Sequence, residues 1–190
     1  MPKYRVFAVD TRGHGKSPRG DAPFTLAQFA EDLERFLDAR GIEKASILGF
    51  SDGGNIALLF ALRRPERMNK LILNGANLSP SGVKIRYQLP IVVLYGIAVL
   101  LSPFSKKALA KKELLALMVN EPHIEASALK SITPPTLVIA GTNDMIRASH
   151  TRKIVAAIPA AELAILPGTH FVAAENSAAF NERVLEFLGK

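Results

Sequence analysis

Apolar and polar positions alternate along this sequence in two different rhythms. Short, nearly continuous apolar runs occupy residues 5–9, 45–50, 70–74, 136–140 and 163–166, and such runs are typical of strands buried on both faces. Between these runs, apolar residues recur at helical spacing. Strands that alternate with helices predict a mostly parallel sheet covered by helices on both faces. The sequence therefore predicts the α/β class with five strands.

Helix-start and helix-stop signals support this alternation. Apolar residues recur at helical spacing between residues 26 and 37, Thr25 and Gln28 are spaced as a capping box, and Gly41 follows the end. Three further helices are expected, each after a strand and a turn, at about 53–64, 149–158 and 177–188.

Residues 81–131 interrupt the strand–helix alternation. They contain an apolar run at 89–101, a group of lysines and a predicted helix at 106–119, and two prolines then precede the next strand. We expect one domain over residues 1–190, with 81–131 inserted as a small helical cap.

The apolar run at 89–101 has thirteen residues and includes Pro90 and Gly96. It is shorter than the ~20 residues that a helix needs to span a bilayer, so we expect no stable membrane insertion. Because lysines follow it, a helix on a membrane surface is one interpretation. A buried helix that roofs a pocket is the other, and we favour it.

Composition narrows the classes of function. The 24 basic and 17 acidic residues give a net charge of +7, but the basic residues are dispersed and not interleaved with aromatic residues. This argues against nucleic-acid binding. The sequence has no cysteine, which excludes thiol and zinc-thiolate chemistry. No apolar segment of signal-peptide type opens the sequence, so we expect a cytoplasmic protein.

The sharpest local signal is Gly49-Phe50-Ser51-Asp52-Gly53, a Gly-x-Ser-x-Gly sequence between a predicted strand and a predicted helix. Glycines on either side relieve crowding in a tight turn, so that the serine hydroxyl stands clear of the sheet. The positive N-terminal end of the helix favours the negative charge that develops in acyl transfer. We interpret Ser51 as a nucleophile. A glycine-rich turn without a chemical role is the alternative.

A serine nucleophile needs a base, and the base needs a partner that holds its tautomer. Of the four histidines, His170 follows the last predicted strand, at the same sheet edge as Ser51. His14, His123 and His150 fall in the first turn, in the cap and in a predicted helix, and we interpret them as surface or packing residues. His170 is therefore the predicted base.

Asp144 follows the fourth predicted strand, and functional groups of open α/β sheets collect at this carboxyl edge. An Asx turn or a helix cap is the alternative role for this aspartate. The chain order serine, aspartate, histidine is the one expected for this type of turn. The sequence thus predicts that Ser51, Asp144 and His170 converge.

The sequence resembles α/β-hydrolase-fold enzymes over nearly its whole length. Residues 10–17, Asp-Thr-Arg-Gly-His-Gly-Lys-Ser, resemble the turn after that family's fourth strand, and the serine turn and the two loops follow in family order. The resemblance implies a triad of Ser51, Asp144 and His170, a small-molecule substrate, no metal or organic cofactor, and a cap that shapes the pocket. A serine in place of aspartate argues against the haloalkane-dehalogenase and epoxide-hydrolase relatives.

The sequence departs from the family pattern at its start. The family's first three strands, and the loop that supplies half of the oxyanion hole, should precede the segment with which this sequence begins. The third of these strands lies between the fourth and fifth strands of the family's sheet. We therefore expect an N-terminally truncated copy, impaired as a catalyst and able to dimerise through an open sheet edge.

Asp52 follows the serine directly and has two interpretations. Its carboxylate is favourable at a helix N-terminus, or it recognises a cationic group on the substrate. Its backbone N–H is the predicted oxyanion donor.

Together these residues favour a serine hydrolase that cleaves a small ester, or an amide or activated C–C bond, through an acyl-enzyme on Ser51. A non-catalytic or weakly active remnant of such an enzyme is the main alternative. A lipid-surface binding module that uses residues 89–101 and the following lysines is a third hypothesis.

Overall fold

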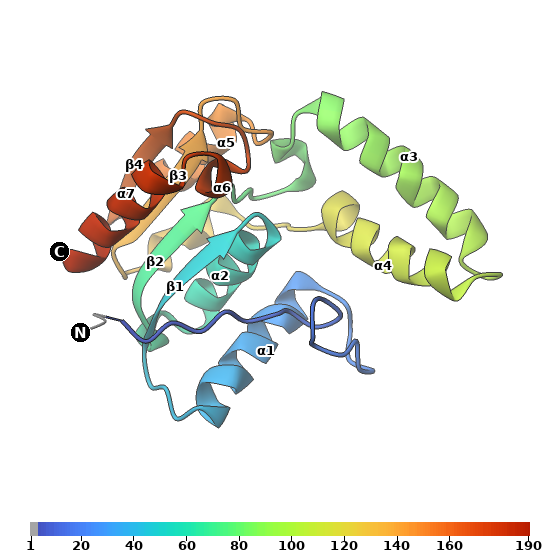
Figure 1. The fold of residues 1–190 in the computed structure, drawn as a ribbon, viewed down its shortest axis with the longest axis horizontal. Helices are drawn as coiled ribbons and strands as arrows, with labels where there is room; N and C mark the ends of the chain where they lie inside the picture. Colours follow the sequence, from blue (N-terminus) through green and yellow to red (C-terminus); the bar gives the residue numbers. More distant parts are fainter. Residues whose placement is uncertain (1–3) are drawn as a thin grey trace.

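The computed structural model describes residues 4–190. Its described residues form one parallel sheet with the strand order β1-β2-β3-β4 (Figure 1). The strands are β1 (Ala45–Phe50), β2 (Met68–Asn74), β3 (Thr136–Gly141) and β4 (Ala161–Leu166). Because all four run in the same direction, their carboxyl ends meet at one edge of the sheet.

Helices cover both faces of this sheet (Figure 1). One face packs against α2 (Asp52–Arg63) and α5 (Ala148–Ala157), and α1 (Leu26–Ala39) packs on α2. The opposite face packs against α7 (Ser177–Gly189), which follows the short helix α6 (Val172–Glu175). The predicted α/β class is confirmed.

The side chains of β2 show how one strand serves both faces. Leu71 and Leu73 belong to the core with α1, α2 and α5, whereas Ile72 belongs to the core with α7. Successive residues of a strand point to opposite faces, so a continuous apolar run is what a strand buried on both faces requires. This is why the run at residues 70–74 identified a strand correctly.

Between β2 and β3 the chain leaves the sheet. This segment contains α3 (Ile85–Leu101) and α4 (Lys106–Asn120), with the 3-10 helices η2 (Pro80–Gly82) and η3 (Ala126–Ser131) at its ends. A third 3-10 helix, η1 (Pro65–Arg67), precedes β2. Helices α3 and α4 pack side by side and project away from the sheet as a hairpin (Figure 1).

The predicted strand at residues 5–9 is wrong, and the described sheet has four strands rather than five. A strand exists only where its backbone groups pair with a neighbour. Within residues 4–190, β1 pairs with β2 alone, and no strand lies along its other edge. Residues 5–9 therefore stay extended and unpaired, with Val6 84% exposed and Val9 45% exposed.

Helix α1 keeps half of its predicted capping box. The hydroxyl of Thr25 accepts a hydrogen bond from the backbone N–H of Gln28 at 3.1 Å. The Gln28 side chain does not return this contact, because its amide nitrogen donates to Asp32 one turn later at 3.2 Å. Gly41 follows the helix end with φ +63°, a left-handed conformation that glycine adopts without strain.

None of the helices within residues 4–190 combines the length and the apolar content that a membrane-spanning helix needs.

Candidate active site

Ser51 makes the turn between β1 and α2. Its backbone has φ +54° and ψ −119°, and it is the one non-glycine residue with positive φ among residues 4–190. Its N–H donates to the carbonyl oxygen of Asn74 on β2 at 2.8 Å. A strained backbone persists only where its surroundings hold it, and here the adjacent strand and the start of α2 do so.

Of the two glycines in the Gly-x-Ser-x-Gly motif, only Gly49 is required by close packing. A Cβ at Gly49 would collide with the carbonyl oxygen of Gly53, so no side chain fits there. Gly53 itself faces open space, whereas a Cβ at Gly54 would lie 3.1 Å from the Cβ of Ala76. The first glycine of the motif is required by the turn, and the second close approach belongs to Gly54, which the motif does not include.

The structure brings together the three side chains that the sequence singled out. The Nε2 atom of His170 lies 3.0 Å from the Oγ of Ser51, and its Nδ1 lies 2.7 Å from Oδ1 of Asp144. His170 and Asp144 are 4% and 3% exposed, whereas Ser51 is half-buried. The hydroxyl can donate to Nε2 only in the tautomer whose Nδ1–H donates to the carboxylate, so Asp144 selects that tautomer.

Asp144 is held as a carboxylate by its hydrogen bonds. Its Oδ1 also accepts the backbone N–H of Ile146 at 2.9 Å, and its Oδ2 accepts that of Gly141 at 3.4 Å. Burial acts to raise the pKa of Asp144, but the hydrogen bonds from His170 and Ile146 outweigh it and hold the pKa below its usual range. The contact with Ile146 is also an Asx turn. Asp144 can therefore orient His170 and stabilise this turn at the same time.

Two glycines that the sequence analysis missed make room for the histidine loop. A Cβ at Gly75 would lie 2.5 Å from the Cε1 atom of His170, and Gly75 has φ +67°. A Cβ at Gly141 would collide with the carbonyl oxygen of Thr169. Their position directly after β2 and at the end of β3 was the signal available in the sequence.

The segment directly before α3 is hydrogen-bonded to the loop that carries Asp144. The ammonium group of Lys84 donates to the backbone carbonyl of Asp144 at 2.6 Å, and its backbone N–H donates to that of Met145 at 2.9 Å. The N–H of Arg147 donates to the carbonyl of Gly82 at 2.7 Å. These three hydrogen bonds therefore link the loop that carries Asp144 to the segment directly before α3.

A cavity of about 300 Å³ lies beside Ser51. Its lining residues come from the N-terminal loop, α1, the serine turn, α2 and α4: Val9, Thr11, His14, Phe29, Phe50, Ser51, Asp52, Gly53, Ile56 and Leu117. The cap, expected to shape this pocket, contributes Leu117, whereas the N-terminal loop contributes three residues. His14 is exposed and stacks on Phe24, and it also forms part of this wall.

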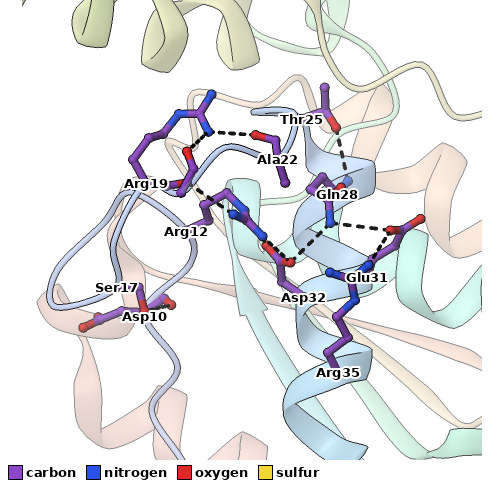
Figure 2. Close-up of polar contacts among 11 residues, drawn as sticks. Asp10, Arg12, Ser17, Arg19, Ala22, Thr25, Gln28, Glu31, Asp32 and Arg35 are labelled. Atoms are coloured by element: carbon purple, nitrogen blue, oxygen red, sulfur yellow. Dashed lines mark hydrogen bonds and ion pairs between the residues drawn. The ribbon is translucent and has the colours of Figure 1, made fainter.

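The N-terminal loop is fastened by charged side chains (Figure 2). Arg12 donates two hydrogen bonds to Asp32 of α1, at 2.8 and 2.7 Å, and a third to the carbonyl of Arg19 at 3.3 Å. Arg19 in turn donates to Glu113 of α4 at 3.0 and 2.7 Å. The wall of the cavity that carries Val9, Thr11 and His14 thus depends on contacts at the protein surface.

Asp52 places a carboxylate in this cavity. Burial raises the pKa of Asp52, although His14 and His170 act in the opposite direction. No cationic side chain in the described part of the chain forms an ion pair with it. A partly buried carboxylate without an ion-pair partner is less stable than a fully solvated one, so this group favours a positively charged or proton-donating partner.

Comparisons with known proteins agree with this architecture. Residues 2–96 match the family model described as alpha/beta hydrolase fold. A RutD protein from Caulobacter sp. strain K31, named as a carbamate hydrolase, is 30% identical over 99% of this chain and 82% of its own length. A 2-hydroxy-6-oxononadienedioate/2-hydroxy-6-oxononatrienedioate hydrolase from Cupriavidus pinatubonensis is 30% identical over 98% of this chain and 76% of its own length.

Solved structures lead to the same family. The crystal structure of a hydrolase from Pseudomonas aeruginosa PA01 superimposes with a TM-score of 0.73 and 28% identity, covering 95% of this chain and 78% of that one. The family model covers half of the chain, and relatives of 30% identity extend along almost all of it. The chain therefore belongs to the α/β hydrolase fold family.

Proposed function

We propose that this protein is a serine hydrolase that cleaves a small carboxylic ester through an acyl-enzyme on Ser51. The observation that supports it most is the connected set Ser51–His170–Asp144, with distances of 3.0 and 2.7 Å, beside a cavity of about 300 Å³. The base lies within hydrogen-bond reach of both the nucleophile and the orienting acid, as nucleophilic catalysis requires. The cavity is at the small end of the range for small-molecule sites.

In this mechanism the Oγ of Ser51 attacks the ester carbonyl while its proton passes to Nε2 of His170. The carbonyl oxygen becomes an oxyanion, to which the backbone N–H of Asp52 donates at the positive end of α2. His170 then gives the proton to the departing alcohol, which leaves an acyl group on Ser51. Water, deprotonated by His170, releases the acid. Asp144 stays ionised throughout and holds the imidazolium.

The proposal also specifies the type of bond that the enzyme cleaves. Relatives are named for carbamate hydrolysis and for hydrolysis of 2-hydroxy-6-oxononadienedioate, so amide-like bonds and activated C–C bonds are alternative substrates for the same acyl chemistry. We place esters before amide-like bonds because an alkoxide is a better leaving group than an amide nitrogen and so demands less of a site with one assigned oxyanion donor. The second part of the proposal is that the Asp52 carboxylate favours substrates with a positive charge near the scissile carbonyl.

Covalent labelling tests the proposal directly. A fluorophosphonate probe should modify the wild-type chain at Ser51, and p-nitrophenyl acetate should be hydrolysed. Ser51→Ala should abolish both, whereas Ser46→Ala, which removes an exposed serine of β1, should change neither. A folded wild-type chain that takes up no probe would show that it is a non-catalytic remnant of the family. Ester hydrolysis that survives Ser51→Ala would disprove the assigned nucleophile.

A further inference from the structure

The α3–α4 hairpin has a surface that a free helical hairpin does not normally present. Among the residues of α3, Ala98 alone is buried, although a helix that is apolar on all sides is normally enclosed by protein or lipid. Six exposed apolar residues recur every three or four positions along α3 and onto its tip. We call them the hairpin patch: Leu89, Val93, Ile97, Leu100, Leu101 and Phe104. Exposure is highest at the tip, where Leu100 is 74% and Phe104 is 87% exposed.

Basic residues are dispersed along the chain, but its net positive charge is concentrated in the same hairpin. Residues 81–112 hold six basic side chains and no acidic one, so the rest of the chain carries 18 basic and 17 acidic residues. Lys106, Lys107 and Lys111 are exposed directly after the tip. The first acidic residue beyond them, Glu113, is already paired with Arg19. Almost all of the net positive charge therefore surrounds the hairpin patch.

Exposed apolar residues together with positive charge indicate which kind of partner binds the hairpin patch. A second copy of the chain would bring the same six positive charges against the first, and like charges at an interface are unfavourable. An anionic bilayer offers both complements, because its acyl chains accept apolar side chains and its headgroups attract lysines. The hairpin also projects away from the sheet, with its tip remote from the rest of the domain (Figure 1), so that a flat surface can reach it.

We propose that the α3–α4 hairpin docks the protein on an anionic lipid surface, with the hairpin patch at the acyl boundary and the three lysines at the headgroups. The association is peripheral, since no described helix can span a bilayer. It does not depend on the proposed hydrolase activity, because neither the patch nor these lysines line the cavity beside Ser51.

Vesicle co-sedimentation tests the proposal, with phosphatidylcholine vesicles that contain or lack phosphatidylglycerol. The wild-type chain should bind only the anionic vesicles, and more weakly at high salt. Replacing Lys106, Lys107 and Lys111 by Gln should weaken binding about a hundredfold, since each basic residue near an anionic surface contributes about fivefold. The double variant Leu100→Glu/Phe104→Glu should weaken binding at least about tenfold, because two exposed apolar side chains no longer insert.

Matched control variants outside the hairpin distinguish binding by this site from non-specific electrostatic or hydrophobic binding. Lys130, Arg152 and Lys153 are exposed basic residues, and their replacement by Gln should leave binding within about twofold, as they lie outside the charged hairpin. Val6→Glu/Leu185→Glu removes two exposed apolar side chains elsewhere and should also have little effect. Circular dichroism and thermal melting confirm that each variant is folded.

Three results would overturn the proposal. One is equal binding to neutral and anionic vesicles. Another is an equal loss of binding in the hairpin variants and in their controls. The third is a wild-type dimer that binds no vesicles and that Leu100→Glu/Phe104→Glu converts to a monomer in sedimentation velocity, which would assign the hairpin patch to a second copy of the chain.

Discussion

The two sides of Ser51 are built by different means. On the side of β2, β3 and β4, His170 and Asp144 are almost fully buried, and backbone N–H groups hold the carboxylate in place. On the side of β1 and the N-terminal loop, Leu48 is 47% exposed and Val9 is 45% exposed. There, ion pairs between side chains near the surface hold the wall of the cavity.

The difference follows from where each side lies in the sheet. Asp144 follows β3, which has neighbours on both edges, and His170 follows the edge strand β4 but is held by its hydrogen bond to Asp144. Both residues are almost fully buried, so they are positioned by dense packing. In the described chain β1 also has a neighbour on one edge only, and the loop near its other edge is held by ion pairs between partly exposed side chains. Changes on the packed side should therefore act on turnover, and changes on the exposed side on substrate binding.

The largest effect is expected from the packed side. Asp144→Asn keeps the shape of the side chain but removes the charge that selects the His170 tautomer, so kcat for an activated ester should fall by about 10⁴-fold with little change in KM. Steady-state kinetics with a melting curve for each protein measure this. A loss of less than tenfold in a folded variant would mean that Asp144 serves only the turn with Ile146.

The second prediction tests whether the unpaired edge of β1 limits the turnover rate. Extending the chain at its N-terminus with the three strands that the family resemblance implies should pair the free edge of β1 and supply a second oxyanion donor. One such donor is worth about 10²- to 10³-fold in turnover. The unextended chain should also self-associate through this edge in sedimentation velocity. If it is monomeric, melts cooperatively and works within about tenfold of the extended chain, the open edge is no handicap.

The third prediction concerns the carboxylate of Asp52, which directly follows Ser51. Asp52→Asn should lower kcat/KM for esters with a nearby ammonium group by about tenfold or more, since two charges 4 Å apart interact by about 4 kcal/mol at an effective dielectric constant of 20. A neutral ester of the same shape should be affected much less. Equal losses on both esters would return Asp52 to a role at the helix end.

The raised pKa of Asp52 adds a pH signature to this test. Preference for the cationic ester should disappear as pH falls through the Asp52 pKa, above the range of an ordinary aspartate. In the folded state this carboxyl holds its proton more tightly than in the unfolded chain, so its contribution to stability falls as pH rises from the usual pKa to the raised one. Asp52→Asn removes this loss, and the variant should be at least as stable as the wild type at neutral pH.

The smallest effect is expected at the surface contacts of the N-terminal loop. Arg12→Met breaks both hydrogen bonds to Asp32 and loosens the wall that carries Thr11 and His14. KM should rise by up to about tenfold while kcat stays within about twofold, because substrate positioning is lost and the reacting groups are not. Arg35→Met is the matched control, because it removes an exposed arginine of α1, the helix that carries Asp32. A fall in kcat alone would contradict the division between the two sides.

Local patterns in the sequence were sufficient for the four strands, the main helices and the turn at Ser51. These features depend on residues close in the chain: apolar runs, helical periodicity and glycines around a tight turn. The order of the three polar residues along the chain also placed them correctly, because the carboxyl ends of parallel strands share one edge. The sequence alone therefore predicts that Ser51, Asp144 and His170 meet.

Only the tertiary structure decided what depends on partners distant in the chain. Residues 5–9 have the composition of a strand but no neighbour within residues 4–190 with which to pair, and composition cannot supply one. The need for glycine at residues 75 and 141 arises from atoms of His170 and Thr169, and no local spacing encodes those approaches. The exposure of the α3–α4 hairpin has the same origin, since an apolar helix is buried only where another surface reaches it.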